Sequence, residues 1–134
     1  MPRIIQGRVV YALDALPDTE GRNPKPNRPC IVVSDDNASL SLDDLVTVIC
    51  VSRSVHGKDE EVPLPHGPNC RHGFPNESAA ICNWGAKIPK SRLDVTKRIL
   101  RPTDLRDVLI KHIEYREQKR VIWVTDGMYP SDTS

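Results

Sequence analysis

The stretch that decides the fold is NPKPNRPCIVVSDDNASL, residues 23–40, in which a proline-rich basic loop leads into a short apolar run. Ile31, Val32 and Val33 are β-branched, which is typical of a strand, and the Asp-Asp-Asn after them is typical of a turn. Arg28 stands where the loop meets the strand. An arginine at that junction is either a solvated loop charge or a cation held on a rigid edge for a ligand.

The apolar pattern predicts further short strands on both sides of this one. β-branched and aromatic residues recur in 8–13, 30–34, 45–52, 61–65, 78–84 and 95–100. The run LVTVICVS, 45–52, is apolar enough to be buried on both faces of a sheet. The long loop 14–29 is the kind of connection that is usually functional or mobile.

The period changes to that of a helix after residue 101. One helix face is formed by Leu105, Val108, Leu109, His112 and Ile113, which follow the spacing i, i+3, i+4, i+7, i+8. Thr103 is the expected N-cap. Residues 121–124 (VIWV) form either a last strand or an apolar tail, and 125–134 are expected to fray.

Closely spaced strands followed by one helix predict a mainly β, α+β domain. We expect a small, strongly bent sheet or partial barrel that carries a C-terminal helix. The length of 134 residues suits one domain. That domain is expected over 1–120, with a C-terminal extension over 121–134.

Composition limits the classes of partner. Lysine and arginine number 19 against 18 aspartates and glutamates, so a polyanion would have to meet a local cluster of charge. The chain shows neither a secretory signal nor an apolar run long enough to cross a bilayer. A cytoplasmic protein with no membrane partner is therefore expected.

One short segment raises the question of a metal. His66, Cys70 and His72 lie close together in HGPNCRHG. A zinc site needs a fourth ligand, and none is evident. A polar hairpin loop is the better interpretation, and no metal or cofactor is expected.

The order of motifs along the chain carries a resemblance. Arg28-Pro29 opens CIVVS, and before the helix come, in order, GRVV, this strand, VTVICVSRS, EVPLP, ESAAICN, KSRL and KRILR. In this order and spacing the chain closely resembles the MazF/PemK family of toxin endoribonucleases over residues 6–118. The arginine-proline pair and the following strand that ends in Ser52 are the most specific part.

The resemblance implies a fold, an activity and partners. The fold would be a small, partly open SH3-like barrel of the MazF/PemK/CcdB kind, and the protein a homodimer. It would cut single-stranded RNA at short sequences without a metal and leave a cyclic phosphate. A cognate antitoxin would block it, and toxin and antitoxin together would bind DNA. Arg28 and Ser52 would be the catalytic pair.

The chemistry of these two side chains agrees with that role. Attack of an RNA 2′-hydroxyl on the adjacent phosphate builds negative charge, to which Arg28 can offer a bidentate fork and Ser52 a hydroxyl hydrogen bond. Arginine stays protonated in proteins, so it is a poor general base. Glu20 in the loop and His56 after the strand are the alternative candidates for proton transfer.

Basic and polar residues elsewhere could hold the RNA. The candidates for the RNA backbone are Arg22, Lys25, Arg53, Lys87, Lys90 and Arg92, each of which could equally be a solvated surface charge. Asn83 could hydrogen-bond a base edge. Trp84 could stack on a base, or it could be a core or dimer aromatic.

Three departures from the family pattern leave other functions open. Arg8 replaces an acidic residue of the opening motif, the loop 14–29 is longer, and Asn83 stands where PemK-like members have an aspartate. These departures favour a non-catalytic barrel that binds protein or nucleic acid. A toxin that targets gyrase is the third alternative, since one fold supports several functions.

Overall fold

The computed structural model describes residues 3–34, 41 and 44–129. The strands are β1 (Arg8–Ala12), β2 (Arg28–Val32), β3 (Leu45–Ser52), β4 (Glu61–Pro63), β5 (Ala79–Pro89), β6 (Leu93–Ile99) and β7 (Ile122–Trp123). A 3-10 turn, η1 (Lys90–Arg92), joins β5 to β6, and the helix α1 (Pro102–Glu117) follows β6. The expected turn at 35–40 and the last five residues of the segment 125–134, which was expected to fray, lie outside the described residues. In its described part this segment is held by hydrogen bonds of Thr125 to the Lys87 N–H and of Tyr129 to Asp14, so the expected fraying is wrong there.

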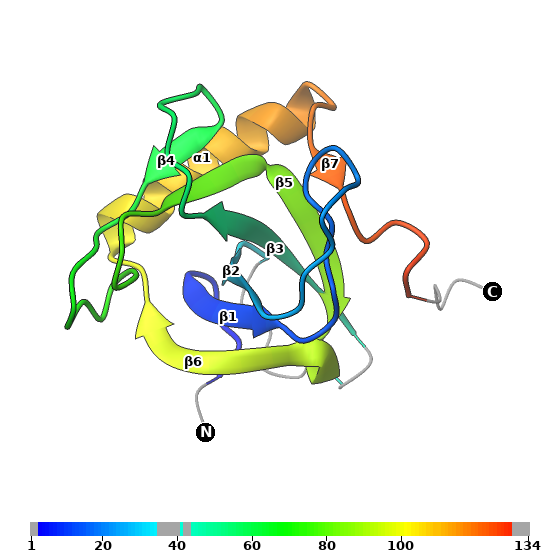
Figure 1. The fold of residues 1–134 in the computed structure, drawn as a ribbon, viewed down its shortest axis with the longest axis horizontal. Coiled ribbons are helices and arrows are strands. Elements are labelled where there is room, and N and C mark those ends of the chain that lie inside the picture. Colours follow the sequence, from blue (N-terminus) through cyan, green and yellow to red (C-terminus); the bar gives the residue numbers. More distant parts are fainter. Residues whose placement is uncertain (1–2, 35–40, 42–43, 130–134) are drawn as a thin grey trace.

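The strands form one bent sheet (Figure 1) in the order β4-β5-β3-β2-β1-β6, with antiparallel neighbours. Strand β7 pairs with β5 in parallel, so the segment that was expected to be a strand or a tail contains a short strand. The sheet does not close on itself. The prediction of a mainly β, partly open barrel with a C-terminal helix is confirmed.

Several predicted strand boundaries differ from the structure, and two of these differences, in β2 and β5, bear on the site. Strand β2 begins at Arg28, so this residue belongs to the sheet and pairs with Ala12. Strand β5 runs on to Pro89, five residues past the predicted end. Pro89 is the last residue of β5, so its missing N–H group does not disturb the pairing of the residues before it. At Gly85 a Cβ would come within 2.8 Å of the Trp123 ring, so the glycine allows β7 to pack closely against β5.

The sheet separates two apolar clusters, which confirms that β3 is buried on both faces. Alternate residues of a strand point to opposite faces. Accordingly Val48 and Cys50 pack in one cluster, while Ile49 and Val51 pack in the other. The second cluster includes Val108 of α1 and lies where the helix packs on β5 and β4.

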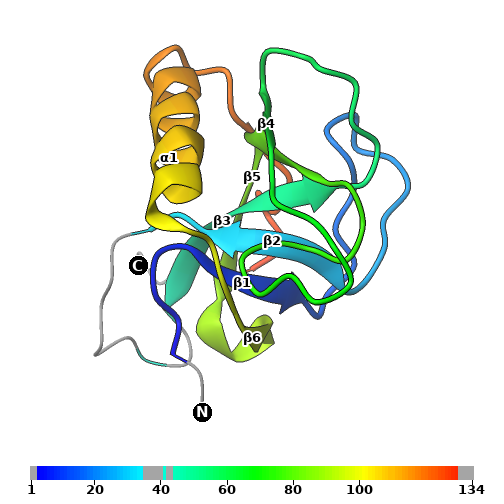
Figure 2. The ribbon, with the colours of Figure 1, turned by 90° about the vertical axis from the view of Figure 1, so that its left-hand side faces the viewer.

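The helix stands on one side of the sheet, and the loop that precedes β2 lies on the other side (Figure 2). Thr103 is not its N-cap: Arg101 holds that position and Pro102 is the first helical residue, a favoured place for proline. The predicted face is right at Val108 and His112. It is wrong at Ile113, which is half exposed, because the buried face continues to Tyr115 instead.

His112 holds the helix to the sheet through a buried hydrogen bond. Its Nδ1 lies 3.0 Å from the Cys82 carbonyl oxygen, and only a protonated Nδ1 can donate to that acceptor. In the neutral ring Nε2 is then unprotonated, and this buried atom has no partner among the described residues. Burial lowers the pKa of His112 below its usual value, because a charge there would lose its hydration.

The His112 environment predicts an acid-sensitive stability. The folded-state pKa is depressed, so the unfolded chain binds the proton more readily, and the free energy of unfolding falls as pH drops below about 6.5. Urea unfolding between pH 7.5 and 5 should show this fall in the wild type. It should be much smaller in His112→Asn, whose amide can still donate to Cys82, and unchanged in His66→Asn, an exposed control. An equal pH dependence in all three proteins would contradict this account.

Candidate functional site

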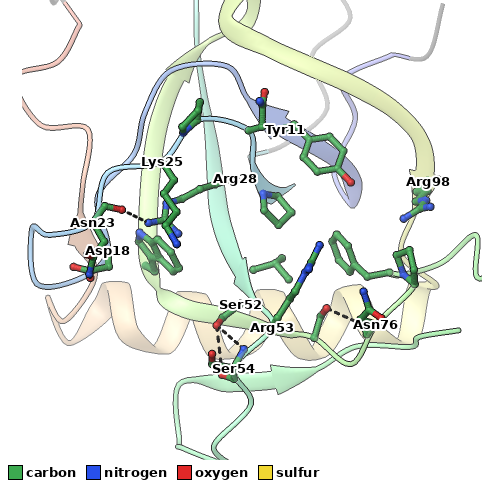
Figure 3. A pocket seen from close by; sticks show the side chains of 18 residues that line it. Tyr11, Asp18, Asn23, Lys25, Arg28, Ser52, Arg53, Ser54, Asn76 and Arg98 are labelled. Carbon is green, nitrogen blue, oxygen red and sulfur yellow. Dashed lines mark hydrogen bonds between the residues drawn. The ribbon is translucent and has the colours of Figure 1, made fainter. Parts of the chain in front are cut away.

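A cavity of about 680 Å³ opens at the end of the sheet where β2 begins and β3 ends. Figure 3 shows its lining side chains, which come from the β1–β2 loop, the strand ends and the segment before β5. The cations that line it are Lys25, Arg28, Arg53 and Arg98, whereas Asp18 is the only carboxylate that the described residues contribute to the lining. This excess of positive charge suits an anionic ligand.

The strand register brings Arg28 and Ser52 to the same place. Cys30 of β2 lies opposite Cys50 of β3. Continuing this antiparallel register by two residues sets Arg28 opposite Ser52, on the face that both cysteines share. Both side chains line the cavity. The pair predicted from the sequence is therefore brought together.

The Arg28 guanidinium is held on three sides. Its Nε donates to the Leu16 carbonyl oxygen at 2.7 Å, and one Nη donates to the Asn23 carbonyl oxygen at 2.6 Å. The guanidinium carbon lies 5.0 Å from the centre of the Trp84 ring, at the distance of a cation–π contact. Arginine has five N–H groups, so these contacts fix its plane and leave donors for a ligand.

The loop that supplies these carbonyl groups is itself anchored. The Leu16 and Lys25 backbones exchange a pair of hydrogen bonds. The Trp84 indole N–H donates to the Pro17 carbonyl oxygen at 3.2 Å. The segment that was expected to be functional or mobile is thus tied to the sheet next to the cavity.

Asp18 is a structural carboxylate within this loop. It accepts backbone N–H groups from Arg22 and Glu20, both at 2.9 Å, and the Asn23 amide at 3.1 Å. These bonds, that of Arg22 above all, hold the pKa of Asp18 below its usual value. An ionised carboxylate whose oxygens are already engaged is a weak proton acceptor.

The Ser52 hydroxyl is oriented by the turn that follows β3. Its oxygen accepts the Ser54 N–H at 3.0 Å and lies 3.4 Å from the Ser54 carbonyl oxygen. The second contact is long for a hydroxyl hydrogen bond. The Ser52 proton can therefore turn toward a ligand at small cost.

The other predicted site residues divide into two groups. Lys25, Arg53 and Trp84 line the cavity. Trp84 is only 6% exposed and packs in the core, which favours the core alternative for its ring. The side chains that do not line the cavity are Glu20, Arg22, His56, Asn83 and Lys87.

Each residue of the second group has a different environment. Glu20 is exposed and lies 3.9 Å from Arg22. The backbone of exposed His56 donates to Glu61. Lys87 lies over the Trp123 ring. Glu20 and His56 therefore lie outside the cavity lining, and this position does not support a role for either side chain in proton transfer.

Asn83 and Arg8, the two departures from the family pattern, also lie outside the cavity lining. The Asn83 Oδ1 atom is buried without a partner among the described residues. The Arg8 guanidinium donates to the carbonyl oxygens of Arg3 and Lys97 and so ties the N-terminal segment to β6. Neither side chain alters the surroundings of Arg28 directly.

Of the remaining candidates, Arg92 forms a two-pronged ion pair with Asp14, at 2.7 and 3.1 Å, and does not line the cavity. The metal alternative finds no support. Within residues 3–34, 41 and 44–129, no group of three histidine, cysteine or acidic side chains is arranged to hold a metal ion. His72 instead contacts the Ile99 carbonyl oxygen at 3.0 Å.

Sequence reasoning missed several cavity residues, among them Tyr11, Asp18, Asn76 and Arg98. Tyr11 carried a usable signal, because it alternates with the buried Val10 and Ala12 and must face away from them. Arg98 carried none. It reaches the cavity only because β6 pairs with β1.

Comparisons with known proteins identify the family and the fold. The family model of PemK-like, MazF-like toxins of type II toxin–antitoxin systems matches residues 6–113. The chain belongs to this family. No curated protein matches it significantly. In the part of the chain that the structure describes, no helix is long and apolar enough to cross a membrane.

Solved structures share the fold at low identity. A chain of the MazE–MazF complex from Deinococcus radiodurans is 18% identical, with a TM-score of 0.62 over 87% of this chain and 99% of that one. A mycobacterial endoribonuclease is 14% identical, with a TM-score of 0.60 over 87% and 94%. The Mycobacterium tuberculosis toxin MazF-mt6 is 20% identical, with a TM-score of 0.55 over 83% and 97%.

The contact between Trp84 and the loop gives a prediction. Trp84→Phe keeps an aromatic ring under Arg28 but removes the N–H bond to Pro17, at a cost of about 1 kcal/mol in the free energy of unfolding. Hydrogen exchange of the Leu16 and Lys25 amides should become faster. Trp123→Phe, which changes the tryptophan on β7, should leave these two amides protected. Unchanged exchange in Trp84→Phe would refute the anchoring role.

Proposed function

We propose that this toxin is a metal-independent endoribonuclease that cuts single-stranded RNA. The observation that carries the proposal is the convergence of Arg28 and Ser52 on one cation-lined cavity. The family match supports the toxin class, and one of the structurally similar proteins is a mycobacterial endoribonuclease.

The reaction uses a nucleophile that the RNA already carries. The 2′-oxygen attacks the adjacent phosphorus, the bond from phosphorus to the 5′-oxygen breaks, and the proton lost by the 2′-hydroxyl is replaced by one on the leaving 5′-oxygen. The products are a 2′,3′-cyclic phosphate and a 5′-hydroxyl. Because no water has to be activated for this step, the reaction does not require a metal-bound hydroxide.

Arg28 and Ser52 act on the charge that develops at phosphorus. The free N–H groups of Arg28 face the cavity with a permanent positive charge, and the Ser52 hydroxyl can donate beside it. Donors fixed in advance stabilise a transition state without reorganisation, and one such donor contributes on the order of 10²–10³ in rate. The contacts with Leu16, Asn23 and Trp84 provide this fixation for Arg28.

Two partners follow from the same proposal. The similar Deinococcus radiodurans chains were solved with MazE, and we infer that a cognate antitoxin binds and blocks this chain. The active species is inferred to be a homodimer in the cytoplasm. Analytical ultracentrifugation of the purified toxin should give twice the chain mass of 15.1 kDa.

The test of the enzyme activity uses long single-stranded RNA in the presence of EDTA. The wild type should release fragments that end in cyclic phosphate. Arg28→Ala and Ser52→Ala should each lose on the order of 10²–10³ in rate. Arg28→Lys should also be strongly impaired, because an ammonium group lacks the planar fork.

Arg106→Ala on α1 is the matched control, since its side chain is 70% exposed and lies outside the cavity lining. Intact RNA with a folded wild type would overturn the proposal. RNA that is bound and left intact would identify a non-catalytic binding barrel. Inhibition of gyrase without RNA cleavage would identify the third alternative.

A further inference from the structure

The side of the cavity away from Arg28 has a feature that the cleavage step leaves unused. Arg98 of β6 lines the cavity, and its Nη1 atom is buried without a hydrogen-bond partner in the described part of the chain. Leaving a buried charged donor unpaired is costly. Such an orphaned group in a native fold indicates a ligand that satisfies it.

Arg98 is also far enough from Arg28 to meet a different group. Arg28 pairs with Ala12 of β1, while Ile99, next to Arg98, pairs with Arg8. The backbones of Arg28 and Arg98 are thus two strand steps apart across the sheet and about three residues apart along it, or roughly 14 Å. In Figure 3 the two guanidinium groups lie on different sides of Tyr11. Arg98 therefore enters the cavity from a different strand and from a different side than Arg28.

A second cavity continues from Arg98. It has a volume of about 520 Å³, and the cations in its lining are Arg71, Lys97 and Arg98. No carboxylate of residues 3–34, 41 and 44–129 lines it. Arg98 lines both cavities, so the cations of the second cavity adjoin the side of the first cavity that lies away from Arg28.

From this arrangement we propose that Arg98 forms a second phosphate subsite and that Tyr11 stacks on the base between the two phosphates. The substrate that fills the site is a single-stranded RNA with at least two linking phosphates. This inference rests on the proposed function, and it adds a second phosphate contact and a base contact to the contacts at the cleaved phosphate. A guanidinium fork matches phosphate geometry, and Tyr11, which is partly exposed and lines the cavity, offers an aromatic ring on which an unpaired base can stack, so RNA fits better than an acidic peptide.

A length series on the wild type tests the subsite without any variant. Mixed-sequence 2′-O-methyl oligonucleotides without terminal phosphates lack the nucleophile and stay intact. Binding should tighten on the order of tenfold between dimers, which have one phosphate, and trimers, which have two. Equal affinities for dimers and trimers would overturn the subsite.

Variants test the residue itself with a twelve-nucleotide 2′-O-methyl pool. Arg98→Gln should weaken binding on the order of tenfold and reduce the slope of log affinity against log salt by about 0.7. Arg98→Lys should keep most of the slope and lose part of the affinity. Tyr11→Leu should weaken binding several-fold without changing the slope. Arg106→Gln, the matched exposed control, should change neither quantity.

The outcomes separate this inference from the proposed function. If Arg28→Gln weakens binding while Arg98→Gln binds like the wild type, the second subsite is wrong and the nuclease proposal stands. If the wild type neither binds nor cuts RNA, both are wrong. An oligoglutamate peptide of equal charge that binds as tightly as the RNA, with the same loss in Arg98→Gln, would also overturn the RNA assignment.

Discussion

The fixed position of the Arg28 guanidinium is the constraint on which the site depends. Two carbonyl groups of the β1–β2 loop accept its hydrogen bonds, and the Trp84 ring supports its face. The same tryptophan is bonded to the loop at Pro17. Loop, arginine and core are therefore ordered together, and the free donors of Arg28 are aimed before a ligand arrives. Such preorganisation is what electrostatic catalysis requires.

The two-sided burial of β3 fixes the other half of the site. A slip of one residue in the β2–β3 register would turn every side chain of the strand to the opposite face, and apolar packing on both faces opposes it. Cys30 and Cys50 lie opposite each other with their sulfurs 3.7 Å apart and buried. Burial raises the pKa of the Cys50 thiol well above its usual value, so it packs as a neutral group. Ser52 is thereby held beside Arg28.

Local sequence patterns were enough to predict the strands and the helix, because alternation and period lie within short segments, and the family resemblance singled out Arg28 and Ser52, which both line the cavity. Local patterns did not predict the features that depend on contacts between distant parts of the chain. The extension of β5 depends on Gly85 facing Trp123, and Arg98 joins the site only through the pairing of β6 with β1. Glu20 and His56 were chosen for their chemistry and nearness in sequence, but folding leaves both outside the cavity lining.

The most direct measurement is a crystal structure of the toxin with an RNA of its preferred cleavage sequence in which the attacking 2′-hydroxyl is replaced by hydrogen. The account predicts one phosphate that accepts hydrogen bonds from both the Arg28 guanidinium and the Ser52 hydroxyl, with the contacts of Arg28 to Leu16, Asn23 and Trp84 unchanged. A scissile phosphate bound elsewhere on the protein, or an Arg28 that leaves these three contacts to reach it, would contradict the account.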